Sequence, residues 1–238
     1  MLGMRSGIRQ AGNPKSTCRG GLADGVARGA DDRHLGRPAK PKRALKRVMD
    51  LTLVFIFLPV WVPVIILLGL IIKLSDGGPI FFRRRVMGPK GSFDAFKLRT
   101  MRVDADRWLE RHPQLLEEFR KNFKLKEDPR VTKLGMFLRK YSLDELPQLL
   151  NVVKGQMSLV GPRMVTRPEL EKYGPYQALL LTMKPGITGY WQVSGRQEVS
   201  YEERVKMDVY YIQNWSLWYD CKILCFTVWK VLKREGAY

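Results

Sequence analysis

An uncharged run over residues 51–72 limits the folds open to this chain more than any other feature of its sequence. A straight helix rises ~1.5 Å per residue, so this run would be about 33 Å long, enough to cross the hydrocarbon core of a bilayer. The run is too long, and starts too far from the N-terminus, for a cleaved signal peptide. We therefore expect a membrane helix over residues 42–74, preceded by a disordered basic tail over 1–41 and followed by a cytosolic domain over 75–238.

Two features of this run bear on how it enters the membrane. Pro59 and Pro63 lie in its middle, and each proline removes a helical hydrogen bond and favours a kink. Basic residues flank the run on both sides, whereas a spanning helix usually has an excess of them on one side. These features favour a re-entrant helix hairpin, which enters and leaves through the same cytoplasmic leaflet, over a spanning helix.

The composition narrows the choice of partners. The chain has 42 Lys and Arg against 23 Asp and Glu, a formal net charge of +19, which indicates anionic lipid or phosphorylated substrates. We do not expect nucleic acid, because no aromatic residues are interleaved with the charges of the tail. Cys18, Cys221 and Cys225 fit a reduced, cytosolic setting. His34 and His112 have no neighbouring ligand pattern, so a zinc or haem site is not expected.

Apolar periodicity and turn residues predict an α+β fold that is mainly helical. Short strands at 80–82 and 93–96 around a turn at 87–91 predict a small β-hairpin. Other expected elements are helices over 104–126 (interrupted at Pro113), 131–141, 168–183 and 200–214, and a loop at 185–189. Residues 215–233 mix tryptophans with lysines, which favours an interfacial amphipathic helix over an ordinary core helix.

Residues 139–163 carry the candidate chemistry. Ser142 and Glu145 have the spacing of a capping box, which predicts a helix that starts here and ends at Gly155. Asp144 would then lie at the positive end of the helix dipole, which also attracts phosphate groups. Adjacent acids beside basic residues could hold a divalent cation and a diphosphate together. The bland alternative is that these acids only start the helix, since acids are common in a first turn.

Six sequence blocks, in family order, resemble the bacterial sugar transferase family of small monotopic phosphoglycosyl transferases. The blocks are KRVMDL (46–51), GPIFF (78–82), FKLRTM (96–101), SLDELPQLLNVVKGQMSLVGPR (142–163), PGITGYWQVSGR (185–196) and DVYYIQNWSLWYDCKIL (208–224). The resemblance covers about three quarters of the chain, and the LDELPQ and VGPR segments are its most specific parts. It implies a compact catalytic domain at the membrane interface.

The resemblance also implies a reaction. A sugar 1-phosphate would pass from a nucleotide diphosphate sugar, commonly a UDP-sugar, to a polyprenyl phosphate such as undecaprenyl phosphate. The products would be a polyprenyl diphosphate sugar and a nucleoside monophosphate, as in the first step of exopolysaccharide, O-antigen or glycoconjugate assembly. Asp144 would be the nucleophile that forms a covalent phosphosugar ester, and Glu145 would assist it through the metal or by handling a proton. Mg²⁺ is the implied cofactor, with Asp144 as a ligand.

Further expectations follow from the same resemblance. The implied phosphate-binding residues, at basic positions of the family, are Lys97, Arg99, Arg139 and Arg163. The family's membrane helix is re-entrant and breaks at a Ser-Pro pair. Pro63 matches that proline, and Val62 stands in place of the serine. The implied location is the cytoplasmic face of the bacterial plasma (inner) membrane, with membrane lipids as further partners and a homo-oligomer left open.

Two other functions fit parts of the sequence. One is a non-catalytic membrane adaptor whose basic faces bind anionic lipid or a partner protein; such an adaptor has no need of the Asp144–Glu145 pair in its full motif. The other is a glycosyltransferase that moves the sugar without its phosphate. That enzyme would release a nucleoside diphosphate, whereas the phosphosugar transferase would release a monophosphate.

Overall fold

The computed structural model describes residues 40–122, 125, 127–194 and 200–233. All of these residues belong to one compact unit of the chain. Residues 1–39, which hold most of the predicted tail together with Cys18 and His34, lie outside the described residues. The last two residues of the PGITGYWQVSGR block, 195 and 196, lie outside them as well.

The uncharged run forms the end of one helix and most of the next, α1 (Lys40–Ile56) and α2 (Leu58–Asp76). The family resemblance placed the break at Pro63, but α2 continues through Pro63 and the two helices meet at Phe57. Pro59 explains this position, because it lies in the first turn of α2, where the missing N–H of a proline has no helical partner to lose. Pro59 therefore starts a new helix, and Pro63 removes one hydrogen bond inside it.

Much of the apolar surface of α1 and α2 is exposed in the part of the chain that the structure describes. α2 is long and apolar enough to cross a membrane, and only 22% of its most apolar stretch is buried inside the protein. The exposed large apolar side chains on the two helices are Leu45, Val48, Phe55, Ile56, Leu58, Val60, Ile66, Leu67, Leu70, Ile71 and Leu74. An apolar surface of this extent indicates contact with lipid or with another protein.

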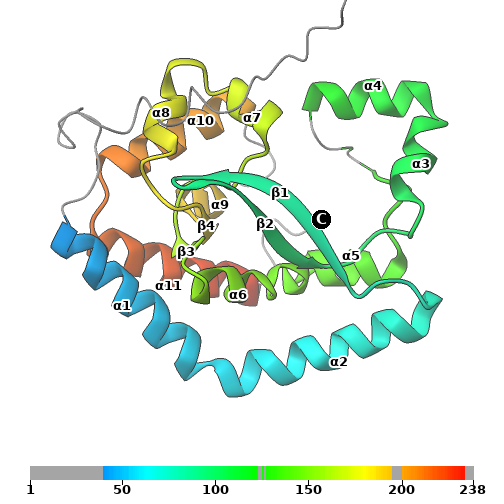
Figure 1. The fold of residues 1–238 in the computed structure, drawn as a ribbon, viewed down its shortest axis with the longest axis horizontal. Coiled ribbons are helices and arrows are strands. Elements are labelled where there is room, and N and C mark those ends of the chain that lie inside the picture. The colour runs from blue at the N-terminus through cyan, green and yellow to red at the C-terminus, as the bar shows by residue number, and fades with distance from the viewer. Residues whose placement is uncertain (1–39, 123–124, 126, 195–199, 234–238) are drawn as a thin grey trace, which may run out of the picture. The chain divides into compact units, whose positions relative to one another are not determined.

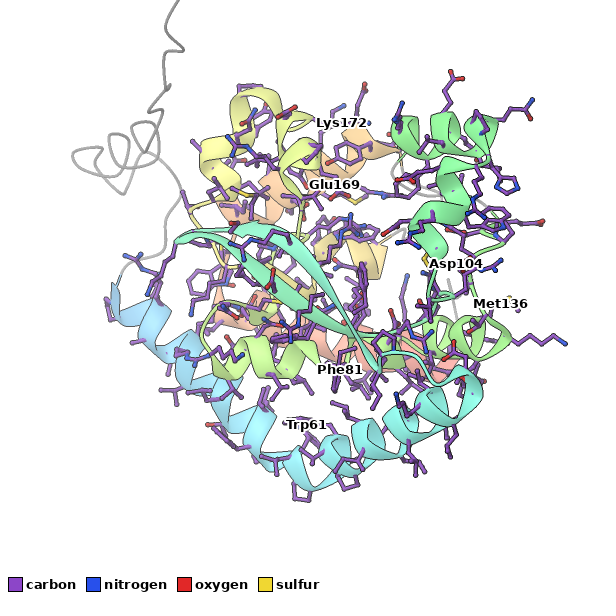
Figure 2. All side chains as sticks on the ribbon, turned by 45° about the vertical axis from the view of Figure 1, so that its right-hand side comes forward. Trp61, Phe81, Asp104, Met136, Glu169 and Lys172 are labelled. Atoms are coloured by element: carbon purple, nitrogen blue, oxygen red, sulfur yellow. The ribbon has the colours of Figure 1, made fainter. Side chains whose placement is uncertain are left out.

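The inner sides of the same two helices pack on the rest of the unit. Val54 and Trp61 join one apolar cluster, and Leu68 and Ile72 join another. The indole N–H of Trp61, labelled in Figure 2, donates to the carbonyl oxygen of Val54 at 3.0 Å. This bond crosses the break and holds α1 at a fixed angle to α2.

An antiparallel hairpin of β1 (Phe81–Gly88) and β2 (Gly91–Leu98) follows α2, as predicted, with longer strands than expected. Pro89 and Lys90 form its turn, and Gly91 has a φ of 105°, which favours glycine. In Figure 1 the hairpin crosses the middle of the view, with α2 below it and α7, α8 and α10 above it.

Three short helices come next: α3 (Ala105–Glu110), α4 (Pro113–Asn122) and α5 (Lys133–Lys140). The interruption expected at Pro113 is confirmed, since α4 begins at that proline. Thr132 caps α5 by accepting a hydrogen bond from the amide of Gly135 at 2.9 Å. The region expected to be helical over 168–183 is broken into α7 (Arg167–Glu171), a 3₁₀ turn η2 (Gly174–Tyr176) and α8 (Gln177–Leu180).

A parallel pair of short strands lies in the core, β3 (Ser158–Val160) and β4 (Gly186–Thr188). The sequence predicted a loop at 185–189, and this prediction was wrong. A Cβ on Gly186 would lie 2.1 Å from the amide nitrogen of Gly161, so glycine here allows close backbone contact instead of a flexible loop. Three further helices follow β4: α9 (Tyr190–Ser194), α10 (Tyr201–Gln213) and α11 (Leu217–Lys233).

Buried polar contacts attach α1 to this core. The ammonium of Lys46 binds the Asp220 carboxylate at 2.5 Å, and Asp50 accepts from the Ser158 hydroxyl at 2.8 Å. The guanidinium of Arg47 donates to the carbonyl oxygens of Val152 and Val153, which end helix α6 (Gln148–Val153). The KRVMDL block therefore fixes α1 to the rest of the compact unit.

The end of α2 is attached through Arg99, which was predicted to bind phosphate. Its guanidinium makes two hydrogen bonds with the carboxylate of Asp76 and donates to the carbonyl oxygen of Pro79 at 2.6 Å. The bond with Arg99 lowers the pKa of Asp76 to about 2. Arg99 thus connects the C-terminus of α2 to the end of β2.

We expect Asp76→Asn to lower the melting temperature in detergent micelles at pH 7 by roughly 1–4 °C, since an exposed ion pair contributes little. Because the pKa of Asp76 is lower in the folded state, its stabilisation is present above about pH 4 and is lost as the pH falls towards 2. The difference between the two proteins should therefore shrink over that range. A difference independent of pH would contradict the ion pair.

Candidate active site

The backbone around Asp144 differs from the predicted helix start. α5 ends at Lys140, a 3₁₀ turn η1 spans Leu143–Glu145, and α6 (Gln148–Val153) follows. Ser142 has a φ of 56° and is the one non-glycine residue with positive φ in the described ranges. Its side chain makes no capping bond, so the predicted capping box was wrong. The predicted stop at Gly155 is confirmed, because this glycine follows α6 with a φ of 75°.

A long-range contact explains why the capping box does not form. The Glu145 carboxylate accepts a hydrogen bond at 2.6 Å from the ammonium of Lys97 on β2, so it is turned away from the amide of Ser142. That amide donates instead to the carbonyl oxygen of Arg139 at 3.1 Å. Left-handed backbone at a non-glycine residue costs about 1–3 kcal/mol and occurs often at functional sites. The left-handed backbone at Ser142 therefore lowers the stability of this turn, while it positions Asp144 and Glu145 beside Lys97.

α6 is held against the outer edge of β2 by one side chain. The amide oxygen of Asn151 accepts from the backbone N–H of Phe96 at 3.0 Å, and its nitrogen donates to the carbonyl oxygen of Asp94 at 2.8 Å. Asn151 is fully buried, so both bonds are protected from water. They fix α6 beside the strand that carries Lys97.

α5 is held against the end of the same strand by close backbone contact. The amide of Thr132 donates to the carbonyl oxygen of Thr100 at 3.0 Å. A Cβ on Gly135 would lie 1.9 Å from that oxygen, so α5 approaches this closely only with glycine at 135. Arg139, near the end of α5, donates from Nε to the Thr100 hydroxyl at 3.0 Å.

These contacts bring four of the predicted site residues together. Asp144 is buried, and its Oδ2 lies 3.7 Å from the Lys97 ammonium, which also binds Glu145. Burial raises the pKa of the Asp144 carboxyl; Lys97 opposes that rise, Glu145 adds to it and Arg139 opposes it. The result is a carboxylate with little hydration beside two cations.

The other two predicted phosphate-binding residues have different neighbours. Arg99 binds Asp76 at the end of α2. Arg163 places its guanidinium over the Trp191 ring, 4.8 Å from the ring centre, and its backbone amide donates to Asp208 at 3.2 Å. Neither is among the main charges acting on Asp144.

Sequence analysis missed Thr100, Asn151 and Asp76, which position the basic residues. Asp76 and Arg99 are separated by 23 residues, which no helix or strand period connects. The one local sign of this contact in the sequence is the position of Asp76, which directly follows the apolar run and precedes Gly77 and Gly78.

Asp144 and Glu145 could bind Mg²⁺ together with water and substrate, but could not enclose the ion by themselves. Among the described residues, no cluster of three or more Asp, Glu, His or Cys side chains could enclose a metal ion. Mg²⁺ commonly binds through one or two carboxylates, with water and substrate phosphate oxygens as its other ligands. Asp144 and Glu145 could supply those carboxylates, and the positive charge of Lys97 beside both opposes binding of the metal until substrate phosphate oxygens are present.

Chemically, the site can stabilise attack on phosphorus. A weakly hydrated carboxylate is available as a nucleophile, and two cations beside it can bind phosphoryl oxygens. Acids that only start a helix would need neither the part-buried contact with Lys97 nor the left-handed turn.

The chain is similar to one described protein family and to several curated proteins. The family model described as "Bacterial sugar transferase" matches residues 41–234. The chain is 45% identical over 198 residues to the exopolysaccharide production protein ExoY of Rhizobium meliloti, covering 81% of this chain and 88% of that protein. It is 44% identical over 204 residues to the undecaprenyl-phosphate galactose phosphotransferase of Salmonella typhimurium, covering 84% and 43%.

A third relative is the UDP-glucose:undecaprenyl-phosphate glucose-1-phosphate transferase of Escherichia coli. It is 39% identical over 206 residues, covering 82% of this chain and 42% of that protein. The chain thus spans about two fifths of the length of several curated relatives that it matches. The match of the family model over residues 41–234 shows that the chain belongs to the bacterial sugar transferase family.

Proposed function

We propose that this protein transfers a sugar 1-phosphate from a nucleotide diphosphate sugar to a polyprenyl phosphate. The observation that carries the proposal is the buried Asp144 carboxylate beside Lys97 and Arg139. The names of the relatives support it, since they include an undecaprenyl-phosphate galactose phosphotransferase. A UDP-sugar donor and a role in exopolysaccharide assembly are part of the proposal on the same grounds.

The reaction has two displacement steps at one phosphorus atom. A carboxylate oxygen of Asp144 attacks the β-phosphorus of the donor, and the bond from that phosphorus to the oxygen bridging to the α-phosphate breaks. The nucleoside monophosphate leaves with that bridging oxygen. An oxygen of the polyprenyl phosphate then attacks the phosphosugar ester and displaces Asp144, which gives the polyprenyl diphosphate sugar.

Lys97 and Arg139 bind the phosphoryl oxygens during both steps. The ammonium of Lys97 is held 2.6 Å from Glu145, so its position is fixed before the donor arrives. Arg139 is held by the Thr100 hydroxyl in the same way. When bound to the acid pair, Mg²⁺ would supply further positive charge for the phosphoryl oxygens.

The membrane arrangement is a second part of the proposal. We infer that α1 and α2 form a re-entrant hairpin at the cytoplasmic face of the bacterial inner membrane, with Phe57 at its turn. The break at Phe57, the exposed apolar side chains and the polar contacts from both ends of the pair to the catalytic domain support it. A polyprenyl phosphate keeps its chain in the bilayer, so its phosphate would meet Asp144 at the membrane surface.

Tags at the two ends of the chain test this arrangement. In intact cells, a cysteine label on the N-terminus and one on the C-terminus should both be inaccessible to a membrane-impermeant reagent, and both should react after the inner membrane is opened. Reaction of one end only in intact cells would show a spanning helix.

The reaction itself is tested with a panel of UDP-sugars. The full chain in detergent micelles is incubated with each sugar and undecaprenyl phosphate, and released nucleotides are separated. Uridine monophosphate and a lipid-linked sugar phosphate should form together with one or more donors. Uridine diphosphate as the product would indicate a glycosyltransferase, and no nucleotide release with any donor would favour the membrane adaptor.

We expect Lys97→Gln to lower kcat/KM for the donor about 100-fold or more, because it removes a fixed cation at the charge that develops on the phosphoryl oxygens. Lys90→Gln is the matched control, since Lys90 is an exposed lysine at the turn of the same hairpin. The measurement is the initial rate of monophosphate release at low donor concentration. Equal rates for the two variants would remove Lys97 from the mechanism.

A further inference from the structure

Gln148 carries a buried amide group that the mechanism above does not use. Its side chain is fully buried at the start of α6, four residues after Asp144. Among the residues that the structure describes, neither Oε1 nor Nε2 of Gln148 has a hydrogen-bond partner. A buried amide without partners destabilises a protein, whereas a methionine of similar size would fill the same space without that cost. The presence of the amide therefore indicates that it finds partners in another state of the protein.

Asn151 lies on the same face of α6 as Gln148, since residues three apart on a helix are neighbours. Asn151 hydrogen-bonds the outer edge of β2 through two backbone groups. Three residues before Gln148, Glu145 binds Lys97 of the same strand. Gln148 therefore lies between two contacts with β2 and faces the strand near residues 96–98.

Two backbone groups of β2 at this position also lack partners. The N–H of Phe96 points towards α6, where it donates to Asn151. Alternate residues of a strand point their N–H and C=O groups to the same edge, so the C=O of Phe96 and the N–H of Leu98 also point towards α6. In the described part of the chain, neither group bonds to another element, and Leu98 is 1% exposed. A buried acceptor and a buried donor thus face an amide that could bond to both.

We propose that Gln148 is a positioning residue for Asp144. When the diphosphate of the donor binds, the Gln148 amide accepts from the N–H of Leu98 and donates to the carbonyl oxygen of Phe96. These bonds repeat, one step along β2, the two bonds that Asn151 makes in the free protein. The proposal rests on the function proposed above and adds to it a closure of α6 onto β2.

The short link between α6 and the acid pair gives this closure its effect. Only Leu146 and Pro147 separate η1 from α6, so movement of the first turn of α6 towards β2 carries Asp144 with it. In the free protein, Oδ2 of Asp144 lies 3.7 Å from the Lys97 ammonium, which is longer than a direct hydrogen bond. Closure shortens this distance and fixes the carboxylate for attack on the donor.

Two substitutions compare bonds that are present in the free protein with bonds that form later. In Asn151→Leu, the buried N–H of Phe96 loses its acceptor, and the melting temperature of the full chain in detergent micelles should fall by about 5 °C or more. In Gln148→Met, no bond of the free protein is lost, so the melting temperature should not fall. A fall as large as that of Asn151→Leu would show that the Gln148 amide is already bonded in the free protein, and would overturn the proposal.

Hydrogen exchange detects the closure without any chemistry. Addition of uridine diphosphate to the full chain should slow exchange about tenfold or more in the shortest peptic fragments that contain Leu98. Gln148→Met should lose this protection. Protection that persists in Gln148→Met, or its absence from the unsubstituted protein, would overturn the proposal.

Release of nucleoside monophosphate in a single turnover separates positioning from binding. With saturating donor and no acceptor, Gln148→Met should react about tenfold or more slowly, while the donor concentration for half-maximal rate changes less than about threefold, because Lys97 and Arg139 still bind the phosphates. Gln177→Met is the matched control, since Gln177 begins α8 and is half-buried, and it should react like the unsubstituted protein. Equal rate constants for Gln148→Met and the unsubstituted protein would overturn the proposal.

Failure of this proposal differs from failure of the function proposed above. Protection of Leu98 that depends on Gln148, without monophosphate release from any donor, would support the closure and contradict the transfer reaction. Transfer at full rate in Gln148→Met, without protection of Leu98 in either protein, would support the reaction and remove this role of Gln148.

Discussion

Replacing Asp144 by Asn should lower the formation of polyprenyl diphosphate sugar by about four orders of magnitude or more, because it removes the proposed nucleophile. An amide of the same shape cannot form the phosphosugar ester. The variant should still fold and remain with the membrane fraction, since the side chain keeps its volume and the apolar helices are unchanged. The measurement is nucleotide release together with lipid-linked product.

A labelling experiment with the unsubstituted protein can detect the covalent intermediate directly. With labelled donor and no acceptor, the protein should gain the mass of one sugar phosphate, located on the peptide that contains Asp144. Asp104→Asn is a suitable control, because Asp104 is an exposed aspartate whose partner is Arg102 on the surface. Near-normal turnover by Asp144→Asn, or a label on another residue, would contradict the mechanism.

Removal of Mg²⁺ should have the second largest effect. Excess chelator should slow the reaction at least about 100-fold, because the metal would contribute several kcal/mol to stabilising the phosphoryl charge. The described protein offers only the two carboxylates of Asp144 and Glu145 at this site, and Lys97 lies between them. We therefore expect weak Mg²⁺ binding to the free protein and much tighter binding when donor phosphate oxygens complete the coordination.

The control for chelation is the same chelator loaded with Mg²⁺, which should leave the rate unchanged. Adding excess Mg²⁺ back to the depleted protein should restore activity, and Ca²⁺ should restore it poorly because it prefers longer bonds and more ligands. A rate that is insensitive to excess chelator would remove the metal from the mechanism and leave Lys97 and Arg139 as the described cations that act on Asp144.

The sequence predicted correctly those helix and strand boundaries that neighbouring residues determine. The hairpin followed from its turn residues, the start of α4 from Pro113 and the end of α6 from Gly155. The helix expected over 200–214 is also present as α10, and the structure shows that a capping box of Ser200 and Glu203 starts it. In each case, residues within one turn determine the backbone.

Predictions failed where a distant residue competes with a local one. Ser142 and Glu145 have capping-box spacing, but Glu145 forms an ion pair with Lys97, which is 48 positions away in the chain. The glycines around 186 suggested a loop, whereas they permit close strand pairing with β3. The acid pair could be proposed from the sequence because its motif is contiguous, whereas the residues that hold its partners in place are scattered along the chain.

The contact between Gly135 and the carbonyl oxygen of Thr100 has a consequence for inheritance. A methyl group added at Gly135 would clash with the carbonyl oxygen of Thr100 and push α5 away from the end of β2. Arg139, on α5, would then move away from the acid pair. A strain with that one change would retain every chemical group of the reaction centre and yet resemble a null allele. Genetic screens for loss of the proposed sugar-phosphate transfer should therefore recover substitutions of this glycine as well as of the two acids.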